Sequence, residues 1–61
     1  MKIKTILIVE DEPDISALVS IILKKSGFVV LQAENGLDAL KIARKTIPDL
    51  IISDIMMPKM N

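Results

Sequence analysis

Short apolar runs that alternate with amphipathic segments constrain the fold of this chain more than any other feature. Residues 3–9 are almost wholly apolar and rich in β-branched side chains, which is typical of a strand buried on both faces of a parallel sheet. Further strand-like runs occupy residues 28–32 and 49–53. The segments between them, residues 14–26 and 36–46, have helical apolar spacing. The sequence therefore predicts the order strand, helix, strand, helix, strand.

Turn and helix-end residues separate these segments. Pro13 suits the first turn of a helix, with Asp11 or Glu12 before it, and Gly27 suits the position just past the helix end. Pro48 ends the second helix. The apolar positions of the first helix are predicted to form its inner face: Ile15, Leu18, Val19, Ile22 and Leu23. The same is predicted for the second helix: Leu37, Leu40, Ala43 and Ile47.

Short connections and right-handed crossovers make all three strands parallel in one α/β sheet. If the first strand lies between the other two, the strand order is 2-1-3 and the two helices cover opposite faces. The crevice between the first and third strands is then the point where such sheets place their ligands.

Acidic residues follow two of these strands. Glu10 and Asp11 come directly after the first strand, and Asp54 comes directly after the third. Carboxylates at one edge of a sheet repel each other unless protons or a cation relieve them, and a hard cation such as Mg²⁺ prefers oxygen ligands. Other interpretations stay open: Asp54 as a solubilising charge at a strand end, Asp11 as a helix N-cap, and Glu10 as a solvated charge.

Composition excludes several classes of function. The 61 residues amount to one small domain with a net charge of 0, which does not suggest nucleic acid or an anionic membrane as a partner. The sequence has no cysteine and no histidine, so thiolate and imidazole sites are excluded, and Phe28 is its only aromatic residue. No apolar run approaches the ~18 residues of a membrane span, and we expect a cytoplasmic chain.

Four motifs, taken in order, resemble the receiver domain of two-component response regulators: residues 6–13, 33–36, 48–54 and 55–58. The resemblance implies that Asp54 is the phosphoacceptor and that Asp11 is a direct Mg²⁺ ligand. It also implies that Glu10 acts beside the metal or through water, and that the backbone carbonyl of Met56 is a further ligand. A sensor histidine kinase would supply the phosphoryl group, so the chain is expected to be a phosphoacceptor module of a phosphorelay and not an enzyme.

The resemblance also implies that residues 1–61 correspond to the N-terminal half of a flavodoxin-like receiver fold. In the family a hydroxyl residue after the fourth strand and a lysine after the fifth hold the phosphoryl oxygens. We therefore expect weak or no phosphotransfer in this chain. We also expect a homodimer, formed through the exposed edge of the strand at residues 49–53 or by segment exchange. The alternative is a self-assembling structural fragment with no retained phosphotransfer chemistry.

Two other functions fit the sequence poorly. Hydrolases that form an aspartyl phosphate usually carry Asp-x-Asp at the strand end, whereas Met56 stands at the second position here. A dinucleotide-binding module needs glycine-rich spacing after the first strand, and residues 10–13 contain no glycine.

Overall fold

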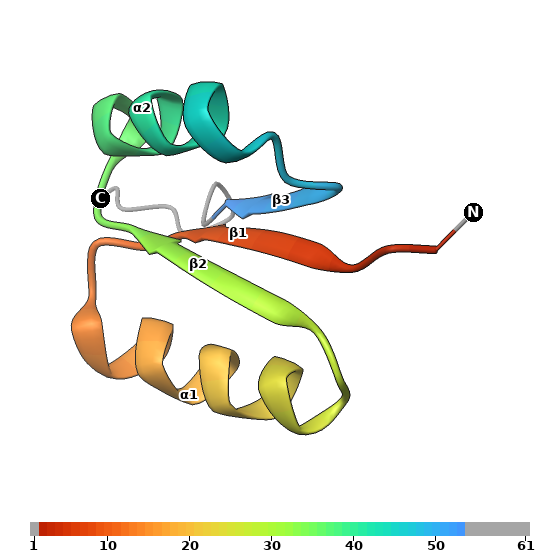
Figure 1. Ribbon diagram of the computed structural model, residues 1–61. Coiled ribbons are helices and arrows are strands. Elements are labelled where there is room, and N and C mark those ends of the chain that lie inside the picture. The colour runs from red at the N-terminus through yellow and green to blue at the C-terminus, as the bar shows by residue number, and fades with distance from the viewer. Residues whose placement is uncertain (1, 54–61) are drawn as a thin grey trace.

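Three parallel strands and two helices form the part of the chain that the computed structural model describes, residues 2–53 (Figure 1). The strands are β1 (Thr5–Val9), β2 (Val29–Ala33) and β3 (Leu50–Ser53), and the helices are α1 (Pro13–Lys25) and α2 (Gly36–Thr46). The sheet has the order β2-β1-β3. This confirms the predicted α/β class and strand order.

The first strand is shorter than the sequence predicts. It begins at Thr5 instead of residue 3, because its ladder with β2 starts where Thr5 pairs with Val29. The backbone N–H of Val29 donates to the carbonyl of Lys4 at 2.8 Å, and the regular pairing ends there. All the other helix and strand ends lie within one residue of the predicted positions.

The core of the described chain lies on β1, because this strand has a neighbour on each side and a helix on each face. Ile6, Leu7 and Ile8 are 2%, 0% and 2% exposed. Figure 1 shows α1 and α2 on opposite sides of the sheet, with β1 between β2 and β3. Both helices pack over β2 and β1, and neither packs on the described residues of β3. Among the described residues, neither helix therefore covers the outer strand β3.

The apolar stripe predicted for the inner face of α1 is largely wrong. Ile15, Leu18 and Ile22 are exposed, at 41%, 59% and 55%, and only Val19 and Leu23 are half-buried. The buried positions of α1 are instead the small residues Ser16 and Ser20. The helix is therefore rotated so that these serines, and not the large apolar residues, face the sheet. Their small side chains let the helix approach β2 closely, and the large apolar residues lie on the flank of the helix.

A similar correction applies to α2. Leu37, Leu40 and Ile47 are exposed, at 65%, 50% and 76%, whereas Ala43 is half-buried as predicted. The residues of α2 that approach the sheet also include Ala39 and Ile42, which are half-buried. The prediction failed for a physical reason, since both apolar stripes extend past the two strands that the helices cover.

The ends of the helices follow local chemistry. The side chain of Asn35 accepts a hydrogen bond from the backbone N–H of Asp38 at 2.8 Å and caps α2. Gly27 has φ 97°, as a residue just past the end of α1 requires. Ile47 has φ 51°, which is uncommon for a β-branched residue. The following Pro48 disfavours the right-handed helical region at Ile47, so α2 ends in this left-handed turn.

Asp49 ties the amino ends of β1 and β3 together. Its Oδ2 accepts hydrogen bonds from the backbone N–H groups of Lys4 and Thr5, each at 2.9 Å. Its own N–H donates to the carbonyl of Thr5 at 2.8 Å. The two N–H donors favour the ionised carboxylate and lower the pKa of Asp49, Thr5 contributing more than Lys4. These three hydrogen bonds, called the Asp49 bracket below, fix the register between β1 and β3. In this register Leu7 lies opposite Ile51.

Candidate functional site

The carboxyl ends of β1 and β3 lie at the same edge of the sheet. Val9, the last residue of β1, pairs with Ser53, the last residue of β3. Glu10 and Asp11 directly follow β1, so they come at the same edge of the sheet at which β3 ends. Of the predicted site residues, Asp54 and Met56 lie outside the described part of the chain.

Glu10 is an ordered part of this edge and not a freely solvated charge. It is 8% exposed, and its Oε2 accepts a hydrogen bond from the backbone N–H of Glu12 at 3.1 Å. The backbone N–H of Glu10 donates to the carbonyl of Ala33 at 3.0 Å, which extends the ladder between β1 and β2. These bonds hold the Glu10 carboxylate at the start of α1.

Asp11 is exposed and lies in the bend between β1 and α1. It does not cap α1, because the capping position belongs to Glu12, whose side chain makes no capping hydrogen bond. The interpretation of Asp11 as the N-cap is thus wrong. Asp11 thus directly follows the buried Glu10 in the chain, and its side chain is open to solvent.

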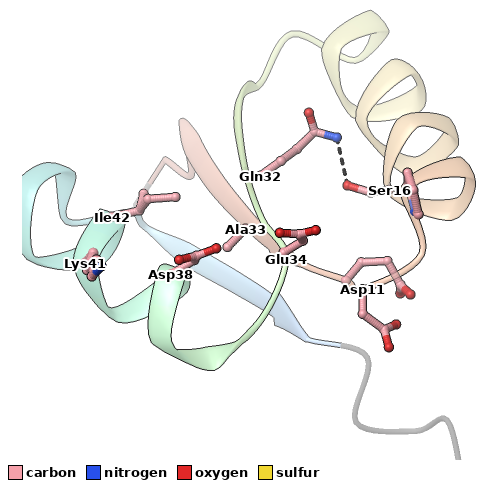
Figure 2. Close-up of a pocket in the computed structure, with 10 residues that line it drawn as sticks. Asp11, Ser16, Gln32, Ala33, Glu34, Asp38, Lys41 and Ile42 are labelled. Carbon is pink, nitrogen blue, oxygen red and sulfur yellow. Dashed lines mark hydrogen bonds between the residues drawn. The ribbon is translucent and has the colours of Figure 1, made fainter.

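A cavity of about 450 Å³ opens beside these two acids and reaches both helices (Figure 2). It is lined by Glu10, Asp11, Pro13, Ser16, Gln32, Ala33, Glu34, Asp38, Lys41 and Ile42. Four carboxylates and one ammonium group give this lining a negative balance, which favours cations over anions. The sequence analysis did not foresee that Glu34 and Asp38 would join Glu10 and Asp11 here.

A hydrogen bond between two uncharged side chains forms one wall of the cavity. Figure 2 shows Gln32 of β2 directed at Ser16 of α1, and its Nε2 donates to the Ser16 Oγ at 2.7 Å. Ser16 is 6% exposed, so the bond satisfies a buried hydroxyl. The one available signal in the sequence was an amide side chain inside the apolar run of the second strand.

The donor set at this edge suits a hard cation. Glu10 and Asp11 supply carboxylate oxygens, the ligands that Mg²⁺ prefers. Within residues 2–53 no three acidic side chains are grouped closely enough to hold a metal ion. The predicted ligand set also includes Asp54 and Met56, which that search did not reach.

The sequence profile of the response regulator receiver domain matches residues 6–61. The match covers most of the chain, and the fold has the strand order expected for half of this flavodoxin-like domain. The chain therefore belongs to the response regulator receiver family. Receiver domains act in two-component signalling, where response regulators are partners of histidine kinases, and they generally bind Mg²⁺.

Several relatives are similar to the chain at more than 40% identity. The transcription regulator BvgA of Bordetella pertussis is 42% identical over 57 residues, which cover 92% of this chain and 27% of BvgA. The alkaline phosphatase synthesis regulator PhoP of Bacillus subtilis is 45% identical over 58 residues, covering 95% of this chain and 24% of PhoP. Protein PilH of Pseudomonas aeruginosa is 45% identical over 56 residues, covering 92% and 46%.

The chain thus spans about a quarter of the length of the first two relatives. Neither helix in the described part of the chain is long and apolar enough to cross a membrane.

Proposed function

We propose that the chain is a phosphoacceptor module of two-component signalling, with Asp54 as the residue that accepts the phosphoryl group. One observation carries the proposal: Glu10 and Asp11 lie at the edge of the sheet where β3 ends, and Asp54 is the next residue of the chain after Ser53. In the proposed site, acidic groups that follow two adjacent parallel strands would meet at the topological switch point of the sheet.

The proposed metal ligands are the carboxylates of Asp11 and Asp54 and the backbone carbonyl of Met56, with Glu10 acting beside the ion or through water. A bound Mg²⁺ would neutralise the negative charge that otherwise repels an incoming phosphoryl group. The hydrogen bond from the N–H of Glu12 holds Glu10 in place whether or not the ion is bound.

In the proposed transfer, a carboxylate oxygen of Asp54 attacks the phosphorus of the donor. A new P–O bond forms an acyl phosphate, and the bond from phosphorus to the donor's leaving group breaks with its electron pair going to that group. The donor is a phosphohistidine of a kinase or a small acyl phosphate. By the resemblance, the hydroxyl and lysine groups that hold the phosphoryl oxygens belong to later strands of the domain. We therefore propose that the 61-residue chain alone accepts the group slowly.

Mass spectrometry after incubation with Mg²⁺ and acetyl phosphate tests this proposal. We expect a fraction of the chain to gain one phosphoryl group. The gain should be lost in Asp54→Asn and kept in the matched control Asp14→Asn, whose carboxylate lies in the first turn of α1. An unmodified chain would contradict the proposed chemistry and favour the self-assembling structural fragment.

The metal ligands have a separate test in amide NMR spectra. Titration with Mg²⁺ should shift the signals of Glu10 and Asp11, and Asp11→Asn should weaken the response. Asp14→Asn again serves as the control. Signals that stay unchanged at millimolar Mg²⁺ would remove the proposed metal site.

The second partner that we propose is another copy of the chain. Neither helix packs on β3, and Leu50, Ile51 and Ile52 are 41%, 51% and 38% exposed. An uncovered edge strand with apolar side chains on both faces favours pairing with a further strand.

A further inference from the structure

We propose that Gln32 and Ser16 are positioning residues for the metal ligand Asp11, because the hydrogen bond between their side chains closes a ring of bonds around the loop that carries Asp11. Their role rests on the proposed metal site and adds two uncharged residues to it. It depends only on contacts among residues 10–33, all of which the structure describes.

The start of α1 lacks the usual capping bond. Glu12 occupies the N-cap position, and its side chain makes no capping hydrogen bond. A capping side chain normally ties the first turn of a helix to the loop before it. The loop of residues 10–12 must therefore be held by other contacts.

Four hydrogen bonds, called the Gln32 ring below, join this loop to the first turn of α1 and to the end of β2. The backbone N–H of Glu12 donates to Oε2 of Glu10 at 3.1 Å, and the backbone N–H of Ser16 donates to the carbonyl of Glu12 at 3.0 Å. Nε2 of Gln32 donates to Oγ of Ser16 at 2.7 Å. The N–H of Glu10 donates to the carbonyl of Ala33 at 3.0 Å, and Ala33 follows Gln32 in the chain, so the ring is closed.

Asp11 lies within the stretch of chain that the Gln32 ring holds. Its two chain neighbours, Glu10 and Glu12, both belong to the ring, whereas Asp11 itself is exposed. Figure 2 shows Asp11 at the same end of α1 as Ser16. The ring thus restrains the backbone on both sides of Asp11 and leaves its side chain open to solvent.

The bond between Gln32 and Ser16 is the link in the ring that can be removed selectively. In the other three bonds the donor is a backbone N–H group, whereas here both partners are side chains. Ser16 is buried in α1, and Gln32 lies on the outer strand β2 and is exposed. Because both side chains are uncharged, replacing them leaves the charge around the metal site unchanged.

A loop that is held in place before the ion arrives should bind it more tightly, because less conformational freedom is lost on binding. Mutation of a group that orients a metal ligand typically lowers metal affinity by about 10–100-fold. Gln32 and Ser16 are neutral and act on the backbone next to the ligand, so their effect should be smaller. The net contribution of one neutral hydrogen bond corresponds to about a 2- to 10-fold change in an equilibrium constant.

Titration of the 61-residue chain with Mg²⁺, followed by amide NMR, tests this role. We expect Gln32→Met and Ser16→Ala each to raise the dissociation constant for Mg²⁺ by about 2- to 10-fold. The double variant should bind no more weakly than the weaker single variant, because both changes remove the same bond. The matched control Ser20→Ala changes a serine that is 4% exposed and lies about one helical turn further along α1, outside the ring. It should leave the dissociation constant unchanged.

A second control separates positioning from a general loss of stability. Gly27→Ala should destabilise the chain from the opposite end of α1, because Gly27 has a φ of 97°, and it should not alter Mg²⁺ affinity. Hydrogen exchange without Mg²⁺ gives an independent readout. In Gln32→Met the amide hydrogens of Glu12 and Ser16 should exchange faster relative to those of β1, through local opening of the loop. In Gly27→Ala this ratio should stay the same.

The result for the unmodified chain separates the positioning role from the metal site itself. If the unmodified chain binds Mg²⁺ and both single variants bind it at least about twofold more weakly, the positioning role is supported. Unchanged affinity in either variant, or equal weakening in Ser20→Ala, would overturn the positioning role and leave the metal site standing. An unmodified chain that shows no response at millimolar Mg²⁺ would overturn the metal site, and the positioning role with it.

Discussion

Truncation of Ile8 measures how much of the stability depends on the central strand. Ile8 is 2% exposed and lies between Gln32 and Ile52 in the sheet. Ile8→Ala removes three carbon groups, worth about 2.4 kcal/mol at ~0.8 kcal/mol for each buried group. The cavity left behind raises the total to about 2–5 kcal/mol. A domain of 61 residues has a stability of about 3–9 kcal/mol, so this single change removes a large share of it.

Urea unfolding followed by circular dichroism provides the measurement, at one fixed protein concentration because self-association would add to stability. Ile8→Val should cost about 1 kcal/mol. The matched control Ile21→Ala removes the same groups from a side chain that is 54% exposed, and it should cost less than about 1 kcal/mol because alanine favours the helix. Equal losses in Ile8→Ala and Ile21→Ala would refute the assignment of the core to β1.

Three further predictions concern residues outside the core. Asn35→Ala should destabilise the chain by about 1 kcal/mol, because the backbone N–H of Asp38 loses its capping hydrogen bond. The control Asn35→Ser should keep most of the stability. Equal losses of stability in the two variants, measured by urea unfolding, would contradict the capping role of Asn35. Gly27→Ala should lower the free energy of unfolding by about 1–2 kcal/mol, because Gly27 has a φ of 97°. Gly36→Ala has open space around the added Cβ and should be neutral or stabilising by up to about 0.5 kcal/mol. Thermal melts that show a change of the same sign for both variants would count against this reasoning. The pKa of Asp49 is lowered in the folded chain, so the ionised carboxylate stabilises the fold. This contribution to the free energy of unfolding is present above the unfolded pKa of about 4 and is lost as the pH falls through the lower folded value. Urea unfolding from pH 7 to pH 2 should therefore show the gap between the unmodified chain and Asp49→Asn closing below about pH 4, and a gap independent of pH would contradict the bracket.

The order and orientation of the elements could be predicted from the sequence because their signals are local. A continuous β-branched run, a proline at a helix start and a glycine past a helix end each act within a few residues. The sites of Gly27 and Pro48 show this directly, since both lie at helix ends as the sequence predicted. Short crossovers then left few possible arrangements of the strands.

The packing faces of the helices could not be predicted by the same reasoning. Periodicity identifies an apolar stripe, but it does not say which neighbour covers that stripe. Ile15 and Ile22 have the spacing of core residues and yet are exposed, while the buried Ser16 carries no apolar signal. Helix spacing alone therefore identified too wide an inner face.

At the candidate site, the acidic pair was the predictable part. Glu10 and Asp11 stand out because they directly follow a buried strand. The contacts that shape the cavity join residues far apart in the sequence, as Gln32 and Ser16 do, and the bracket formed by Asp49 spans more than 40 positions. Such contacts depend on the strand register, which the sequence leaves open.

The exposed position of β3 has a consequence for the dynamics of the acceptor. This strand is held by its ladder to β1 and by the Asp49 bracket, with no helix against its described residues. Its amide hydrogens should therefore exchange with solvent well before those of β1, through local opening of the sheet edge. On the proposed function Asp54 is the next residue of the chain after this strand, so a contact that closes the sheet edge would stabilise the strand that leads to the acceptor.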